Sequence, residues 1–183
     1  MDGCHFGSGL LSSNIIIMLR KEFTELSIFH GLNPEQLDQL ATLIEFYSFP
    51  KGELIFGQGQ ATDFIYILLK GEVEIRYKPY DGPILSVARI FVGGVFGWSA
   101  VVGHESYTSM AVASTNGEAY RICGQSLHDF CASNPETGVI ILEHLASAIA
   151  ERLQSTHSQI LTILGQSMDV EDQCQKRIEE NGK

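Results

Sequence analysis

The chain has 183 residues and a formal net charge of −10, from 22 acidic and 12 basic residues. Proteins that bind DNA specifically present clustered lysine and arginine side chains that neutralise phosphates, whereas the basic residues here are thinly spread. We therefore expect no specific DNA binding by this chain alone. No apolar run reaches the roughly 18 to 20 residues of a membrane-spanning helix, so we expect no membrane insertion.

The four cysteines are Cys4, Cys123, Cys131 and Cys174. They are widely scattered and include no Cys-x-x-Cys pair, a pattern typical of reduced thiols in a cytoplasmic protein. Cys4 stands beside His5, but one neighbouring pair does not make a metal site, which takes about three or four protein ligands. We predict no bound metal and no other cofactor.

Residues 1–26 are predicted to form an N-terminal arm, packed on the domain or on a partner subunit. Clearer helix signals follow this arm. Asn33 is a favourable N-cap and Pro34 suits the first helical position, so we expect a helix over residues 34–43. Apolar residues repeat at intervals of three and four through this segment, as on one face of a helix. They are Leu37, Leu40, Ala41 and Ile44.

A β section is predicted from about residue 45 to residue 123. At its centre, residues 64–78 hold two apolar runs separated by Gly71. The first run, residues 65–69, has no polar interruption, which indicates a strand covered on both faces. In the second, residues 73–77, apolar and charged residues alternate as in a half-buried strand. Gly71 lies where the runs meet, and its lack of a Cβ allows a bend at a barrel corner.

Turns and shorter strands complete this β pattern. Residues 50–52 are predicted to form a turn, and residues 57–60 a loop. The run Tyr80-Asp81-Gly82-Pro83 predicts a hairpin. Short strands at regular spacing with glycine-containing turns are typical of a jelly roll or a barrel. These strands are predicted at residues 54–56, 84–91, 110–114 and 118–123.

The chain is predicted to be helical after Cys123. Ser126 is a candidate N-cap for a short helix at residues 127–131, and Asn134-Pro135 starts a longer helix over residues 136–164. Mostly apolar heptad positions in this longer helix favour a contact between two parallel copies, so we predict a homodimer through it. The polar tail after it is expected to be a frayed helix or unstructured. The heptad residues are Ala146, Ile149, Leu153, Thr156, Ile160 and Ile163.

Several short motifs, taken together, resemble the cyclic-nucleotide-binding domain family. They are Phe49-Pro50-Lys51-Gly52, Ile55-x-x-x-Gly59, Tyr66-Ile67-Leu68-Leu69-Lys70-Gly71-Glu72-Val73, Gly94-Val95-Phe96-Gly97, Asn134-Pro135 and Ala150-x-Arg152-Leu153. The resemblance is to the effector domain of cAMP receptor and fumarate–nitrate regulators.

The resemblance implies a mainly β fold with flanking helices, an eight-stranded jelly roll followed by a long C-terminal helix that forms the dimer axis in those regulators. On this basis the chain divides into an arm (1–26), a cyclic-nucleotide-binding-like domain with its helix (27–164) and a polar tail (165–183).

The resemblance also places the family's phosphate-binding cassette at residues 96–110. In this family a glutamate after the first glycine, here Gly97, accepts a hydrogen bond from the ribose. An arginine eleven residues after that glycine pairs with the cyclic phosphate. This chain has Trp98 and Thr108 at those positions, so we predict weak or absent cAMP and cGMP binding. The candidate pocket residues are Phe96, Gly97, Trp98, Ser99, Ala100, Thr108, Ser109 and Thr156, the last matching a threonine that touches adenine in the regulators.

No Ser/His/Asp set, Cys/His set or P-loop stands out, so we predict a regulatory module and not an enzyme. The first hypothesis is a domain that has lost cyclic-nucleotide binding and responds to another small molecule or to a protein partner. The second is a weak cAMP or cGMP receptor that uses backbone contacts and Thr156. The third is a redox or haem sensor that uses His5, His104 or the cysteines.

The regulators carry a winged helix-turn-helix domain after the long helix, and this sequence stops before one, so we expect a stand-alone module.

Overall fold

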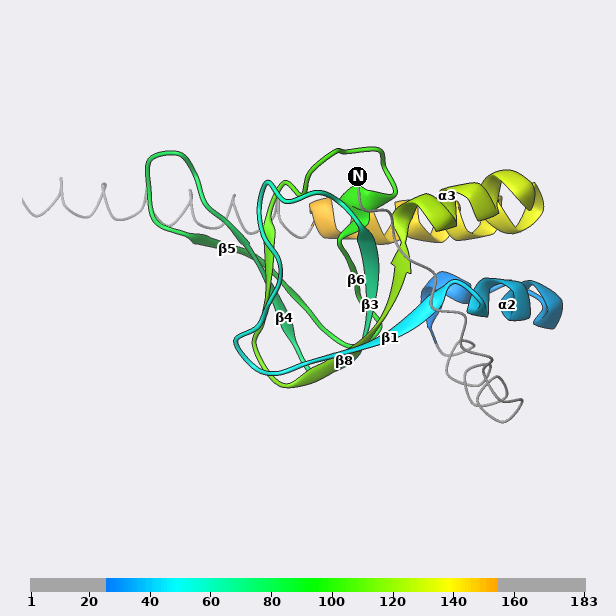
Figure 1. The fold of residues 1–183 in the computed structure, drawn as a ribbon, viewed down its shortest axis with the longest axis horizontal. Coiled ribbons are helices and arrows are strands. Elements are labelled where there is room, and N and C mark those ends of the chain that lie inside the picture. The colour runs from blue at the N-terminus through cyan, green and yellow to red at the C-terminus, as the bar shows by residue number, and fades with distance from the viewer. Residues whose placement is uncertain (1–25, 155–183) are drawn as a thin grey trace, which may run out of the picture. The chain divides into compact units, whose positions relative to one another are not determined.

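The computed structural model describes residues 26–154, in which eight strands form two antiparallel sheets of four (Figure 1). The strands are β1 (Ile44–Phe49), β2 (Leu54–Phe56), β3 (Phe64–Lys70), β4 (Val73–Tyr77), β5 (Leu85–Ile90), β6 (Val95–Phe96), β7 (Met110–Ala113) and β8 (Gly117–Cys123). The first sheet has the order β1-β8-β3-β6 and the second the order β2-β7-β4-β5. Strands that follow one another along the chain mostly lie in different sheets, so the predicted jelly roll is confirmed.

The central strand of the first sheet is β3, which pairs with β6 and with β8. Four consecutive residues of β3, from Ile65 to Leu68, are at most 4% exposed. Because successive side chains of a strand point to opposite faces, Tyr66 and Leu68 face the second sheet, where they join the apolar core. Ile65 and Ile67 point to the opposite face of the sheet and are buried as well. Figure 1 shows the position of β3 in the fold. The predicted strand with two covered faces is confirmed, and so is the alternation of β4.

The chain passes from the first sheet to the second at Gly71, between β3 and β4. Its φ of 92° lies in the left-handed region. A Cβ there would lie 2.7 Å from the carbonyl oxygen of Asn116 and 2.9 Å from the Cα of Gly117. Beside it, the backbone N–H of Glu72 donates to the hydroxyl of Thr115 at 2.9 Å. The predicted bend at Gly71 is therefore confirmed, and it is held against the loop that precedes β8.

Short helices precede the sheets. The first is a 3-10 helix, η1 (Ser27–Phe29), and the second is α2 (Pro34–Ala41). The start of α2 follows from its cap, because Asn33 and Gln36 exchange two hydrogen bonds between side chain and backbone, of 2.8 and 2.9 Å. Such a reciprocal pair satisfies two backbone N–H groups that the first turn leaves unpaired. The predicted N-terminus of this helix is confirmed.

Two predicted helix limits are wrong. Ile44, expected on the apolar face of the first helix, is the first residue of β1, because the helix has already closed at Thr42. The hydroxyl of Thr42 donates to the carbonyl of Gln39 at 2.7 Å and closes the last turn. Ser126, expected to cap the next helix, lies inside α3 (Gly124–Ser133), since β8 runs directly into that helix without a loop.

Residues 135–154 are helical, which confirms the start of the long C-terminal helix. The chain divides into two compact units after residue 146, and the jelly roll with α2 and α3 belongs to the first. Thr156, Ile160, Ile163, the N-terminal arm and the boundary predicted at residue 164 lie outside the described residues. Within residues 26–154, no helix is both long enough and apolar enough to cross a membrane.

The corner at Gly71 gives a stability prediction. Gly71→Ala combines left-handed backbone strain with a steric clash, so we expect it to lower the free energy of unfolding by about 2–5 kcal/mol. Gly52→Ala is the matched control, because Gly52 has a φ of 88° but no atom within 4 Å of the place that a Cβ would take, and its expected cost is about 1–2 kcal/mol. Denaturant unfolding of both variants measures the difference, and equal losses would contradict the steric role of this corner.

Candidate ligand site

The segment predicted to bind ligand, residues 96–110, connects β6 of the first sheet to β7 of the second. It opens at Gly97, whose φ is 73°, and continues into a single turn of 3-10 helix, η2 (Trp98–Ala100). A Cβ on Gly97 would lie 2.8 Å from the carbonyl oxygen of Phe64 and 3.0 Å from the ring of Tyr66. Glycine is therefore required here by both backbone angle and space.

The structure brings only part of the predicted pocket set toward the interior. Phe96, Gly97 and Ser99 are buried, Trp98 and Ala100 are half-buried, and Ser109, directly before β7, is half-buried. Thr108, the position of the family's phosphate-binding arginine, is exposed. Thr156 lies outside the described residues.

The residue beside Thr108 takes the interior position. Tyr107 is only 4% exposed. Its hydroxyl donates to the carbonyl of Phe64 at 2.7 Å and lies 3.0 Å from the backbone N–H of Phe64, which donates to it. Its backbone is fixed as well, by hydrogen bonds of 2.8 and 2.9 Å with Gly59 and Gln60. The second half of the cassette is thus attached to the loop between β2 and β3.

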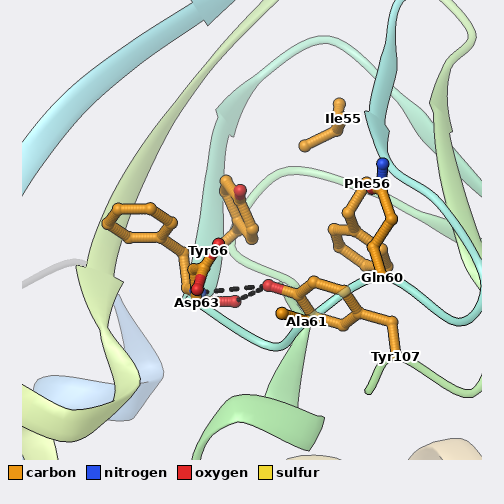
Figure 2. Close-up of a pocket in the computed structure, with 8 residues that line it drawn as sticks. Ile55, Phe56, Gln60, Ala61, Asp63, Tyr66 and Tyr107 are labelled. Atoms are coloured by element: carbon orange, nitrogen blue, oxygen red, sulfur yellow. Dashed lines mark hydrogen bonds between the residues drawn. The ribbon is translucent and has the colours of Figure 1, made fainter. Parts of the chain in front are cut away.

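Four rings fill the interior next to this segment, and we call them the aromatic layer. Phe56 and Tyr107 are stacked with ring centroids 3.9 Å apart, and Tyr66 and Phe96 are stacked at 5.0 Å. Phe56 also lies 5.8 Å from Tyr66 and 6.2 Å from Phe96, so the two stacks touch. Figure 2 shows Phe56 and Tyr107 side by side on one wall of a pocket that this layer borders. Sequence reasoning missed Tyr107, although a tyrosine within a polar loop was the available signal.

The segment itself carries little positive charge. Residues 96–110 contain no lysine or arginine, and His104 is exposed. A guanidinium does lie on the inner face of the first sheet, at Arg121 of β8. It pairs with the carboxylate of Glu45 at 2.8 Å and lies 4.4 Å from the ring centre of Phe64. Its charge is therefore already matched by a carboxylate and an aromatic face.

Two tyrosine hydroxyls near Arg121 stay protonated at neutral pH. Burial, together with the hydrogen bond to Glu53, raises the pKa of Tyr47 to about 12. Burial is also the main cause that raises the pKa of Tyr66 well above its ordinary value. Both groups are neutral hydrogen-bonding groups and not anions, so they neither attract nor repel a charged ligand strongly.

Among residues 26–154, no cluster of three or more histidine, cysteine or acidic side chains is arranged to hold a metal ion. Cys123 and Cys131 are half-buried thiols, and burial raises the pKa of the Cys131 thiol. A thiol whose pKa is raised is a poorer metal ligand and nucleophile. The residues of the third hypothesis that fall in this part of the chain, His104 among them, are not brought together.

The geometry defines a jelly-roll domain of two facing sheets, joined by a glycine-initiated cassette. Residues 46–134, just under half of the chain, match the sequence model of the cyclic nucleotide-binding domain, so this part of the chain is similar to that family.

Among the curated relatives, a CRP-like cAMP-activated global transcriptional regulator of Mycobacterium tuberculosis is 26% identical over 137 residues, 75% of this chain and 59% of the relative. The cyclic AMP receptor protein of Thermus thermophilus is 23% identical over 133 residues, 73% of this chain and 60% of the relative. The chain thus spans about three fifths of the length of these regulators.

Solved structures agree with this assignment. A putative cyclic nucleotide-binding protein from Geobacter metallireducens has a TM-score of 0.65 and 29% identity, and the match covers 73% of this chain and 96% of that one. A cyclic nucleotide-binding domain from Methylobacillus flagellatus has a TM-score of 0.70 at 18% identity, over 81% of this chain and 83% of that one. The second similarity concerns the fold alone.

The anchoring of Tyr107 can be tested by removing one oxygen atom. Tyr107→Phe keeps the ring stack but leaves the N–H and carbonyl of Phe64 without their partner, so we expect a loss of about 1–3 kcal/mol in unfolding free energy. Tyr80→Phe is the control, because Tyr80 is fully exposed and its change should be neutral. A Tyr107→Phe variant as stable as the wild type in urea unfolding would show that the cassette is not held at this point.

Proposed function

We propose that this domain is a regulatory module of the cyclic nucleotide-binding type whose cassette has lost the groups that bind a cyclic phosphate. One observation carries the proposal. The positions of the glutamate and the arginine hold Trp98 and Thr108, and the neighbouring side chain that enters the interior is the neutral Tyr107. The domain signals through another small molecule or a protein partner, and it is not an enzyme.

The expected loss of binding free energy supports the proposal that this cassette does not hold a cyclic phosphate. Loss of one partner from a desolvated charge pair costs on the order of 2–5 kcal/mol, and this cassette lacks the partners of both the phosphate and the ribose. Each 1.4 kcal/mol is about a tenfold change in dissociation constant. The guanidinium of Arg121 on the inner face is already paired with Glu45 at 2.8 Å and would have to break that pair to reach a phosphate.

Similar folds occur in proteins described with different ligands. One is the regulatory subunit of a cAMP-independent protein kinase A from Trypanosoma brucei, with a TM-score of 0.64 at 19% identity, solved as a triple mutant bound to cAMP. Another, from Trypanosoma cruzi, was solved bound to guanosine, with a TM-score of 0.58 at 22% identity. The fold therefore accommodates different ligands, which is consistent with a module that no longer binds cyclic nucleotides.

A second candidate function follows from the transcriptional regulators among the relatives. The domain would be the effector part of such a regulator and a weak or atypical receptor for cAMP or cGMP. The two candidates differ in cyclic-nucleotide affinity. In both, we propose that residues 26–154 do not bind duplex DNA specifically, since the basic residues of the chain are few and unclustered.

The proposal predicts that cAMP and cGMP bind with dissociation constants weaker than about 100 μM, measured by isothermal titration calorimetry. The companion is the double variant Trp98→Glu with Thr108→Arg, which restores both missing partners and should gain measurable binding. Either single variant is the control, because it restores only one partner. Low-micromolar binding by the wild type would refute the proposal and support the second candidate.

We also propose that the module is a homodimer through its C-terminal helix. Three large apolar side chains of this helix are exposed: Val139 at 56%, Leu142 at 46% and Leu153 at 63%. With Ala146 and Ile149 they recur at intervals of three and four residues, the pattern of a coiled-coil seam. On the neighbouring face of the same helix, Ile141 and Leu145 are buried, so the exposed stripe is left for a partner copy.

The proposed dimer predicts that one charged residue placed in its apolar interface separates the two copies. Leu153→Glu would bring two like charges together in an apolar interface, at a cost of several kcal/mol, and should yield a monomer at tens of micromolar protein. Ser147→Glu adds the same charge at an exposed position outside the seam and should leave the dimer intact. Sedimentation equilibrium distinguishes these cases. A monomeric wild type would contradict the proposed dimer.

A further inference from the structure

A cavity of about 360 Å³ lies between the β2–β3 connection and the aromatic layer. None of the pocket residues predicted from the sequence that fall in the described part of the chain lines it. Its walls include Phe56, Phe64, Tyr66 and Tyr107, and its polar groups include Gln60 and Asp63 (Figure 2). Tyr107 is the one residue of the predicted cassette in its lining, so the nucleotide contacts predicted from the sequence do not explain this cavity.

The hydroxyl of Tyr66 is the first sign that this cavity accepts a ligand. Tyr66 is 4% exposed, yet its hydroxyl forms no hydrogen bond with any described residue, whereas the hydroxyls of Tyr47 and Tyr107 both do. In the described part of the chain, every fully buried side-chain oxygen or nitrogen has a hydrogen-bond partner. Because the hydroxyl of Tyr66 has none, this oxygen must belong to the small part of Tyr66 that is exposed. Since Tyr66 lines the cavity, a ligand bound there would supply the partner that the protein does not.

The charge of the cavity specifies the class of ligand. Asp63 is the only acidic or basic side chain of the lining, and it forms no ion pair with any described residue. Its backbone carbonyl accepts a hydrogen bond from Gly124 at 2.9 Å, which fixes the residue beside the start of α3. Arg121 lies next to Phe64 but outside the lining, and it is bound to Glu45. An anion in this cavity would therefore meet a carboxylate.

Aromatic walls and a carboxylate together favour a positively charged ligand. Ring faces attract organic cations, by roughly 0.5–2 kcal/mol per contact in proteins. A planar cation with N–H groups would also place its donors toward the Asp63 carboxylate and the oxygen of Tyr66 while its flat body packs against the rings. We propose that this cavity binds a small planar organic cation of the amidinium or arylammonium class, independently of the predicted pocket residues.

Three isosteric probes of different charge test this proposal on the full chain: benzamidine, benzamide and benzoate. Benzamidine has few atoms, so we expect a dissociation constant of about 1 mM. We expect benzamide to bind about tenfold more weakly, since it lacks the charge, and benzoate to show no binding. Titrations followed by ¹H–¹⁵N correlation spectra should shift the amides of residues 57–66 and of Tyr107. Absence of saturable benzamidine binding up to about 10 mM, or shifts confined to other residues, would overturn the proposal.

Two conservative variants separate recognition from folding. Asp63→Asn keeps the shape of the side chain and should remove the preference for benzamidine over benzamide. Tyr66→Phe removes only the hydroxyl and should weaken benzamidine binding by about fivefold to tenfold. Tyr80→Phe is the control and should bind as the wild type does. Retention of the charge preference in a folded Asp63→Asn variant, checked by its thermal melt, would exclude Asp63 as the recognising group.

Discussion

The aromatic layer between the two sheets is the interaction on which the rest of this structure depends. Phe56 comes from the second sheet, Tyr66 and Phe96 from the first, and Tyr107 from the segment that connects them. Centroid distances of 3.9 to 6.2 Å hold the four rings in one contiguous contact. Each aromatic pair adds about 0.5–1.5 kcal/mol beyond its buried area, and here the pairs also fix the position of the cassette.

This layer explains how the cassette keeps its shape with Trp98 and Thr108 in place of a glutamate and an arginine. Gly97 must pass close to Phe64 and Tyr66, and Tyr107 returns to the same strand through the N–H and carbonyl of Phe64. The segment is thereby attached at both ends to β3 by packing and hydrogen bonds. In this domain, protein groups supply both attachments. The same arrangement leaves a pocket on the β2–β3 side of the rings, with Asp63 as the charged residue of its lining.

Much of the fold could be predicted from local sequence patterns. The parts that could not be predicted depend on contacts between residues far apart in the sequence. The strands on either side of Gly71 and the cap at Asn33 are encoded by neighbouring residues, and both were predicted correctly. β6 has only two residues, too few for any periodicity, and was not predicted as a strand. The inward position of Tyr107 depends on pairing with residues 59–64, and the place of Arg121 depends on the register of β8 between β1 and β3. No local pattern encodes either one.

In the structure, Tyr107 and the aromatic layer fix the cassette in the absence of any nucleotide. Nuclear magnetic resonance of the ligand-free protein tests this most directly, through contacts between the ring protons of Phe56 and Tyr107 and through hydrogen exchange at the amide of Phe64. We predict clear ring–ring contacts and an amide protected to a degree similar to that of its β3 neighbours. Absent ring contacts, together with an unprotected Phe64 amide that becomes protected only when cAMP is added, would contradict the account.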